Sequence, residues 1–154
     1  MGNKLLVDPG VDFRNPPNRG WHLGNGVYIG RNTIIDVQPG AQLRIGNNTK
    51  IMHNVIIGAE INISIGKDVL IAEQVSIRDG NHGTQRGTPI TRQKVDAEPI
   101  TIQDDCWIAR GCAILKGSRI GAGAVIGANS VVMNDIPAYA VAVGAPATVK
   151  KFRH

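Results

Sequence analysis

The sequence predicts an all-β domain in which short strands stack as the coils of a narrow triangular prism. Ile and Val together number 34 (20 plus 14) against 6 Leu in the 154 residues, and β-branched side chains favour strands. Gly is abundant at 19 residues, while aromatic residues make up 4% of the chain, too few for the core of an ordinary β-sandwich. The third observation is a six-residue spacing of aliphatic residues, which fits neither a helix nor an alternating strand.

The six-residue repeat is clearest in the second half of the chain. A small residue stands four positions after most of the aliphatic residues, and Gly often follows them directly. Such a unit fits a short strand and a corner, so three units of six residues close one triangular coil. Coils of this kind stack at strand spacing, and the chain has room for roughly five of them. The unbroken series of aliphatic residues is Ile102, Ile108, Ile114, Ile120, Ile126 and Val132.

The elements are expected in the following order. The segment up to about Trp21 lacks the repeat, so we expect it to be irregular and to cap one end. Coils then run over about 29–137, with a small bulge in the ten residues from Ile35 to Ile45. Residues 138–154 follow the last coil, and we expect a strand or short helix that closes the other end.

A long interruption divides the repeat. Ile77 and Ile102 lie 25 residues apart, and the segment between them is polar and Gly-rich and contains His82. Long excursions from a compact repeat are uncommon and usually functional. The sequence therefore predicts a protruding loop over about residues 78–99.

Charge and hydropathy exclude several partner classes. The formal net charge is +5, but Lys and Arg are spread along the chain, which favours a solvated surface or a small polyanionic ligand over nucleic acid. No run of 18 apolar residues is present, so no membrane span is expected. The first residues do not resemble a signal peptide, so we expect a cytoplasmic protein.

These features resemble those of the hexapeptide-repeat acyltransferases, over about residues 24–150. The most specific segment is similar to the C-terminal part of acetyltransferases that use acetyl-CoA. It includes Asp105-Cys106-Trp107-Ile108, Gly121-Ala122-Gly123-Ala124-Val125-Ile126-Gly127 and Ala142-Val143-Gly144-Ala145-Pro146-Ala147. The resemblance implies a left-handed parallel β-helix, a single domain over 1–154, and a homotrimer with active sites between adjacent prisms.

The resemblance also implies a reaction. We expect an acetyl-CoA-dependent O-acetyltransferase that acts on a sugar hydroxyl, either of a surface polysaccharide precursor or of a small glycoside. One alternative is N-acetylation of an amino sugar or nucleotide-sugar. A second alternative, from a different class, is a β-helix that serves as a binding or scaffold module without catalysis.

His82 is the candidate general base. An imidazole titrates near neutrality, His82 lies in the polar excursion, and the resembling enzymes carry a catalytic His in this loop. Asp79 or Asn81 could orient the ring, and Asn54 and Arg86 are candidates for contact with the acceptor. The alternative interpretation is a solvated loop histidine among Asp and Asn residues that form turns.

The resemblance assigns acetyl-CoA contacts to residues after the excursion. The backbone N–H of Arg110 or Gly111 is the candidate oxyanion donor. Lys150 is expected at the phosphates, helped by Lys151 or Arg153. The complete set of expected cofactor contacts is Trp107, Arg110, Gly111, Ala128 and Lys150.

The sequence argues against a metal or a disulfide. Cys106 and Cys112 are six residues apart, which is the repeat step, so they are expected to stack as corner residues. A zinc site on this fold would require a second His five residues after His82, and that position is Gly87. We therefore expect no metal cofactor.

Overall fold

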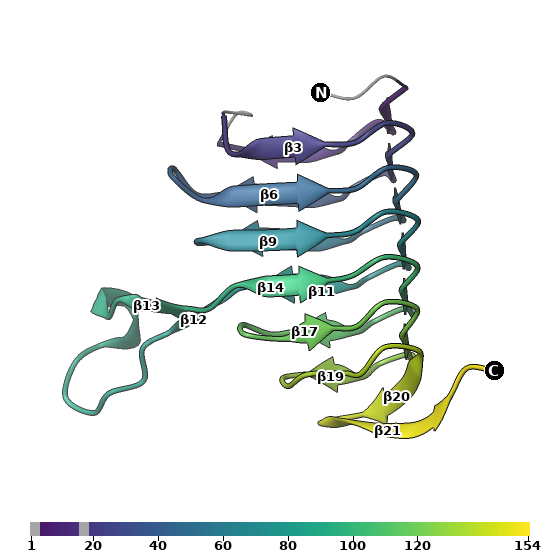
Figure 1. Cartoon of the computed structure of the whole chain (residues 1–154). Helices are drawn as coiled ribbons and strands as arrows, with labels where there is room; N and C mark the ends of the chain where they lie inside the picture. Colours follow the sequence, from purple (N-terminus) through teal and green to yellow (C-terminus); the bar gives the residue numbers. More distant parts are fainter. Residues whose placement is uncertain (1–3, 16–18) are drawn as a thin grey trace.

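The chain folds as a β-solenoid of about six turns. The structure is a computed structural model that describes residues 4–15 and 19–154. All turns but the last contribute one short strand to each of three parallel sheets, so the molecule is a triangular prism (Figure 1). This confirms the all-β coil predicted from the six-residue repeat, and its left-handed sense stays a prediction from the resemblance. No helix in the described ranges is long and apolar enough to cross a membrane.

The first sheet, sheet A, ends in a hairpin. Its strands, in hydrogen-bonded order, are β1 (Leu6–Val7), β4 (Tyr28–Ile29), β7 (Lys50–Ile51), β10 (Leu70–Ile71), β15 (Trp107–Ile108), β18 (Val125–Ile126), β20 (Ala140–Gly144) and β21 (Ala147–Phe152). All of these pair in parallel except β20 and β21, which are antiparallel. The segment after the last coil is therefore a two-stranded cap. Of the strand or short helix expected over residues 138–154, the structure has strands.

The other two sheets complete the prism. Sheet B contains β2 (Asp12–Arg14), β5 (Ile34–Val37), β8 (Ile56–Ala59), β11 (Ser76–Arg78), β16 (Ala113–Ile114) and β19 (Val131–Val132). Sheet C contains β3 (Trp21–Leu23), β6 (Gln42–Ile45), β9 (Asn62–Ile65), β14 (Ile100–Ile102) and β17 (Arg119–Ile120).

The core consists of stacked aliphatic side chains, one or two from most strands of the coil. In sheet A the column runs through Ile29, Ile51, Ile71, Ile108 and Ile126, all with 0% exposure. Each buried aliphatic side chain contributes about 1.5–3 kcal/mol relative to an exposed one. The narrow interior is thus filled without aromatic rings, which explains the unusual composition.

Small residues occupy the corners, as the repeat predicted. The thiol of Cys106 donates to the carbonyl oxygen of Gly121 at 3.2 Å, and the thiol of Cys112 donates to that of Gly127 at 3.1 Å. Both cysteines are buried and free. They stack between successive turns rather than forming a disulfide.

The three corners differ in length. From sheet A to sheet B, and from sheet C to sheet A, successive core residues are six positions apart in every turn, as in Ile29 to Ile35 and Ile45 to Ile51. The corner from sheet B to sheet C varies instead, and its core spacings are ten, eight, 25, six and four residues. These spacings run from Ile35 to Ile45, Ile57 to Ile65, Ile77 to Ile102, Ile114 to Ile120 and Val132 to Ile136.

The coil has one turn more than the roughly five that the repeat predicts. The segment before Trp21 was expected to be irregular, but its described part contains β1 and β2, which pair in parallel with β4 and β5. Phe13 lies beside Ile35 in the ladder and Trp21 beside Leu43, and the two rings are 5.9 Å apart between centroids. Phe13 thus takes an aliphatic place in the first turn, between Val7 and Leu23, and breaks the series of aliphatic residues there.

Candidate active site

His82 lies on an arm that leaves the prism at the corner between sheets B and C. The arm consists of β12 (Gly80–His82), a short 3-10 turn (Ile90–Arg92) and β13 (Val95–Ala97), and it projects well beyond the coil (Figure 1). The two strands are antiparallel, with His82 opposite Val95. The imidazole is exposed and forms no hydrogen bond or ion pair with any described residue, so it is available to a substrate. The protruding loop predicted over about 78–99 is therefore an ordered arm.

The tip of the arm is held by one side-chain amide. The Nε2 atom of Gln93 donates to the carbonyl oxygens of Gln85 at 2.9 Å and Thr88 at 2.7 Å. Its Oε1 atom accepts from the amide of Gln85 at 2.8 Å. His82 and Gln93 line the same open hollow within the arm. The loop next to the candidate base is thus built around a fixed core of its own.

Asp79 holds the root of the arm instead of orienting the imidazole. Its side chain is fully buried, and its carboxylate accepts from the amides of Glu60 at 2.6 Å, Ile61 at 3.0 Å and Asn62 at 2.7 Å. Its own carbonyl oxygen accepts from the amide of Glu98 at 2.9 Å. We expected that Asp79 could orient the ring of His82. Its carboxylate instead binds three backbone amides, so its role is structural.

Asn81 and Arg86 do not join His82 either. Successive residues on a strand point to opposite faces, so Asn81 faces away from the side that His82 takes. Asn81 lines a separate hollow with Glu98 and Lys116. Arg86 is exposed near the tip of the arm, with no ion pair to a described residue.

Asn54 lies at a different corner. It adopts a left-handed conformation with φ of +57°, at the turn between β7 and β8, and its amide donates to the carbonyl oxygen of Arg31 at 3.0 Å. This corner joins sheets A and B, whereas the arm leaves between sheets B and C. Asn54 therefore forms a turn, and within a single chain it lies at a different corner from His82.

Trp107 belongs to an apolar row on the outer face of sheet A. It lies between Leu70 and Val125 in the ladder, and its side chain is 48% exposed. A flat ring beside two aliphatic side chains offers a surface for an apolar chain.

Arg110, Gly111 and Ala128 line the corner between sheets A and B, directly after this row. The Nη2 atom of Arg110 donates to Oε1 of Gln74 at 2.8 Å. The amide of Gly111 donates to the carbonyl oxygen of Glu73 at 3.0 Å, so it is not available to an oxyanion. The amides of Arg110 and Ala128 have no acceptor within the described ranges, which leaves Arg110 as the remaining candidate donor.

Lys150 lies on β21, at an irregularity in the cap. Lys151 is opposite Val141 and Val149 is opposite Ala142, so Lys150 is the extra residue of a bulge. Both lysines are exposed and free of ion pairs to the residues that the structure describes.

Arg153 is already occupied. Its guanidinium donates to Oδ2 of Asp105 at 3.0 Å and to the carbonyl oxygen of Gly123 at 2.8 Å. It fastens the cap to the preceding turns, which leaves the two lysines as the cations for a phosphate group.

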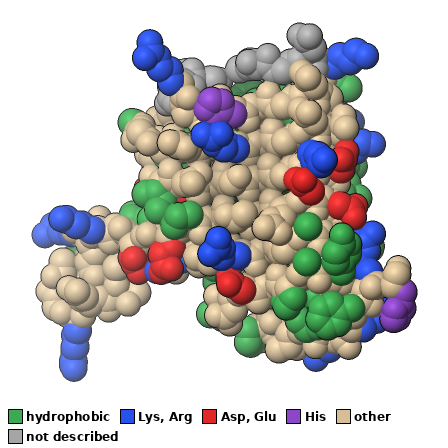
Figure 2. Space-filling model, viewed as in Figure 1, with side chains coloured by type: hydrophobic (Ala, Val, Ile, Leu, Met, Phe, Trp, Pro, Cys, Tyr) green, Lys and Arg blue, Asp and Glu red, His purple; other side chains and the backbone are tan. Residues whose placement is uncertain are grey.

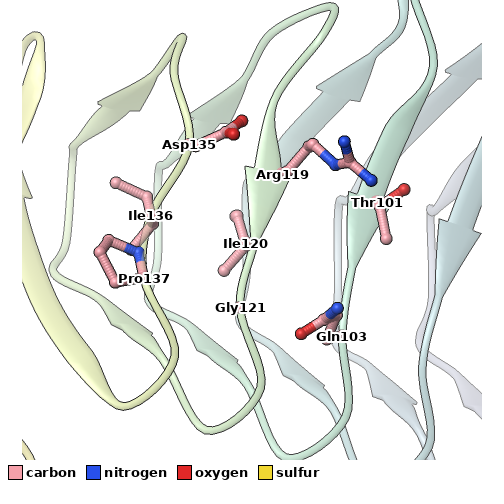
Figure 3. Close-up of a pocket in the computed structure, with 8 residues that line it drawn as sticks. All are labelled: Thr101, Gln103, Arg119, Ile120, Gly121, Asp135, Ile136 and Pro137. Atoms are coloured by element: carbon pink, nitrogen blue, oxygen red, sulfur yellow. The ribbon is translucent and has the colours of Figure 1, made fainter.

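A further groove lies on sheet C, and no motif in the sequence predicts it. Figure 3 shows the side chains of Arg119 and Asp135 above the strand backbones, with the guanidinium turned toward Thr101. The groove is lined by Thr101, Gln103, Arg119, Ile120, Gly121, Asp135, Ile136 and Pro137. It is open, and it is lined by none of the predicted site residues. In Figure 2 the surrounding face is flat and mostly uncharged.

The predicted site therefore separates into two groups within one chain. The arm with His82 leaves the corner between sheets B and C, whereas Trp107 lies on sheet A, the side opposite that corner. Arg110 and Ala128 lie along one edge of sheet A, and Lys150 lies in its cap. Among the described residues no group of three or more His, Cys, Asp or Glu side chains is placed to hold a metal ion.

Comparison with known proteins gives consistent matches. A family model described as bacterial transferase hexapeptide (six repeats) matches residues 99–134. The chain is 37% identical over 151 residues to a probable acetyltransferase of Mycobacterium tuberculosis, which covers 97% of this chain and 50% of that protein. It is 34% identical over 110 residues to the galactoside O-acetyltransferase of Escherichia coli, which covers 71% of this chain and 54% of that protein. The chain thus spans about half the length of these curated relatives.

A solved structure is also similar over most of the coil. The hexapeptide-repeat acetyltransferase of Vibrio cholerae, in complex with acetyl-CoA, matches with a TM-score of 0.77 at 28% identity. The match covers 86% of this chain and 70% of that one.

Proposed function

The chain belongs to the hexapeptide-repeat acetyltransferase family, and we propose that it transfers an acetyl group from acetyl-CoA to a sugar hydroxyl, with His82 as the general base. The observation that carries this proposal is the free imidazole of His82, which an ordered arm presents to solvent. The acetyl donor is suggested by the acetyl-CoA complex of the Vibrio cholerae enzyme, and the sugar acceptor by the Escherichia coli galactoside O-acetyltransferase. The acceptor is a small glycoside or a precursor of a surface polysaccharide.

The reaction is a direct transfer. A ring nitrogen of His82 removes the proton of the acceptor hydroxyl as the oxygen attacks the thioester carbonyl carbon. The amide of Arg110 donates to the oxyanion that develops on the carbonyl oxygen. The C–S bond then breaks, and the imidazolium returns the proton to the thiolate, so CoA leaves as a thiol and the ring is regenerated.

The outer face of sheet A binds the donor in this proposal. Trp107, with Leu70 and Val125, contacts the apolar part of the pantetheine arm. The free amide of Ala128 hydrogen-bonds to one of its carbonyl oxygens, and Lys150 pairs with the phosphates.

The active site in this proposal is shared between copies of the chain in a homotrimer. The His82 arm and the row of Trp107 lie on opposite sides of one prism, so one chain alone does not bring the base to the thioester. A second copy, packed side by side, supplies the missing half.

The general base is tested with His82→Ala. Release of free thiol from acetyl-CoA is followed across neutral sugars, amino sugars and nucleotide-sugars. We expect turnover with a neutral sugar, and a rate lowered by about 10²–10⁴-fold in the variant at an unchanged melting temperature. Unchanged turnover would remove the base assignment, and turnover with amino sugars alone would favour N-acetylation. A chain that is not thermally stabilised by millimolar CoA and transfers to none of the acceptors would be a scaffold.

The shared site is tested by mixing two inactive variants. His82→Ala and Trp107→Ala damage different halves of the site, so co-assembled trimers contain some sites with both halves intact. We expect the mixture to regain part of the activity. The matched control mixes His82→Ala with the double variant His82→Ala/Trp107→Ala, in which no intact site forms. Activity absent from both mixtures, or a monomer by sedimentation, would contradict the shared site.

A further inference from the structure

Lys116 joins the prism to the arm that carries His82. Its ammonium group lies 2.8 Å from Oδ2 of Asp96 and 2.5 Å from Oε1 of Glu98. Lys116 follows β16 on the prism, whereas Asp96 lies on β13 of the arm and Glu98 directly after it. Figure 2 shows the acidic side chains gathered where the arm meets the prism.

This contact differs from an ordinary surface ion pair. The Lys116 side chain is only 18% exposed, although its partners are 68% and 58% exposed. One cation bridges two carboxylates. Its hydrogen bonds raise the pKa of Lys116, with the larger effect from Asp96 and the smaller from Glu98. The backbone supports the same junction, because the amide of Gly117 donates to the carbonyl oxygen of Glu98 at 3.1 Å. An exposed ion pair costs the conformational entropy of two mobile side chains. Lys116 is already held against the prism, so forming this contact costs less entropy.

The other end of this junction is connected to His82 through β12 and β13. Asp96, which Lys116 contacts, is opposite Asn81 in this pair, and the neighbouring residues His82 and Val95 are opposite each other. The root of the arm is held by the carboxylate of Asp79 on the side of β12, and by the backbone hydrogen bonds of Glu98 with Asp79 and Gly117 on the side of β13. Lys116 adds a side-chain attachment beyond the root, at Asp96, one residue from the level of the imidazole.

We propose that Lys116 is a positioning residue for the proposed acetyl transfer: it latches the arm to the prism through Asp96 and Glu98 and so fixes the place of His82. The inference rests on the proposed function of His82. Small misplacement of a catalytic group lowers the rate strongly even when substrate binding is intact. Lys116 itself touches no reacting atom.

The test uses Lys116→Met, which keeps most of the length of the side chain and removes its charge. Lys67→Met is the matched control, since Lys67 is exposed at another corner and its ammonium group pairs with no described residue. We expect Lys116→Met to lower kcat by about tenfold without changing KM for acetyl-CoA, and Lys116→Arg to restore most of the loss. Lys67→Met should match the parent chain.

Hydrogen exchange reports on the latch without any activity. In Lys116→Met, amides of 80–82 and 95–97 should exchange faster while those of the coil are unchanged, and Lys67→Met should show neither effect. Unchanged exchange in the arm would overturn the latch. Uniformly faster exchange with a lowered melting temperature would assign Lys116 to general stability and overturn the positioning role.

A double variant separates this inference from the proposed base. If Lys116 acts through His82, Lys116→Met should lower the rate of the parent but leave the residual rate of His82→Ala unchanged. An equal loss in both backgrounds would overturn the positioning role. If His82→Ala has full activity, the proposed base fails, while the exchange result still decides whether Lys116 holds the arm.

Discussion

The Oδ1 atom of Asp79 lies 2.6 Å from the amide nitrogen of Glu60, at the point where the arm leaves the coil. The same carboxylate accepts from two more backbone amides, so one side chain orders the corner between β8 and β9 in the preceding turn. We predict that Asp79→Ala lowers the free energy of unfolding by about 1–3 kcal/mol, because three amides lose their acceptor. Urea denaturation followed by circular dichroism measures this loss.

The matched control is Asp135→Ala, which removes an exposed carboxylate of the same corner column that has no described partner. It should change stability by no more than about 0.5 kcal/mol. Equal effects of the two substitutions would contradict the role given to Asp79.

Close stacking of the turns predicts different responses at two glycines. A Cβ atom on Gly46 would lie 2.5 Å from the carbonyl carbon of Gly66, whereas on Gly58 it would meet only the Arg78 side chain, at 3.2 Å. Backbone cannot move aside, so Gly46→Ala should cost about 1–3 kcal/mol, while Gly58→Ala should be close to neutral. Thermal melting of both variants checks the difference, and a neutral Gly46→Ala would show that the turns are less tightly stacked.

The buried thiol of Cys106 predicts a loss of stability at high pH. Burial raises the pKa of Cys106 from 9.0 to about 11. Below pH 9 the thiol is protonated in both states, so its contribution to stability is fully present. Between pH 9 and 11 the unfolded chain loses the proton first, so the contribution falls as pH rises.

The control for this effect is Cys106→Ala, which fits because Ala124 fills the same corner of the next turn. Melting temperatures from pH 8 to 11 should fall less steeply in the variant than in the parent chain. Parallel curves would show that Cys106 does not contribute to the pH dependence.

Two cations of the cap should respond differently to removal. Lys150 is exposed and unpaired by any described carboxylate, whereas Arg153 is bound to Asp105. We predict that Lys150→Ala raises KM for acetyl-CoA about threefold to tenfold at low salt, with a smaller effect at high salt because ions screen the phosphates. Arg153→Ala should instead lower the melting temperature and leave KM unchanged. The reverse pattern would assign phosphate binding to Arg153.

Much of the fold follows directly from the spacing of aliphatic residues. Six-residue steps place Ile108 and Ile126 in one column, and both are buried as predicted. The first turn could not be found in this way, because Phe13 interrupts its aliphatic series and β-propensity does not distinguish an aromatic core residue from a surface one.

The site was less predictable, because its residues are assigned by contacts far apart in the sequence. The excursion located His82, but nothing in the sequence near Asp79 indicates that its carboxylate binds the backbone 17 to 19 residues earlier. Likewise, Lys116 occupies an ordinary place in the repeat, and only the fold brings it to Asp96. Long-range hydrogen bonds and ion pairs of this kind leave no local signal.

The unequal corners have a consequence for how such a chain can change. Two corners are fixed at six residues, so any inserted residue there would shift all later side chains out of their columns. The corner between sheets B and C instead takes spacings from four to 25 residues while the ladder on both sides stays in register. The coil therefore keeps a constant core while one corner accepts insertions of very different length. The arm with His82 is such an insertion, and it could be exchanged, in evolution or by design, without changing the core.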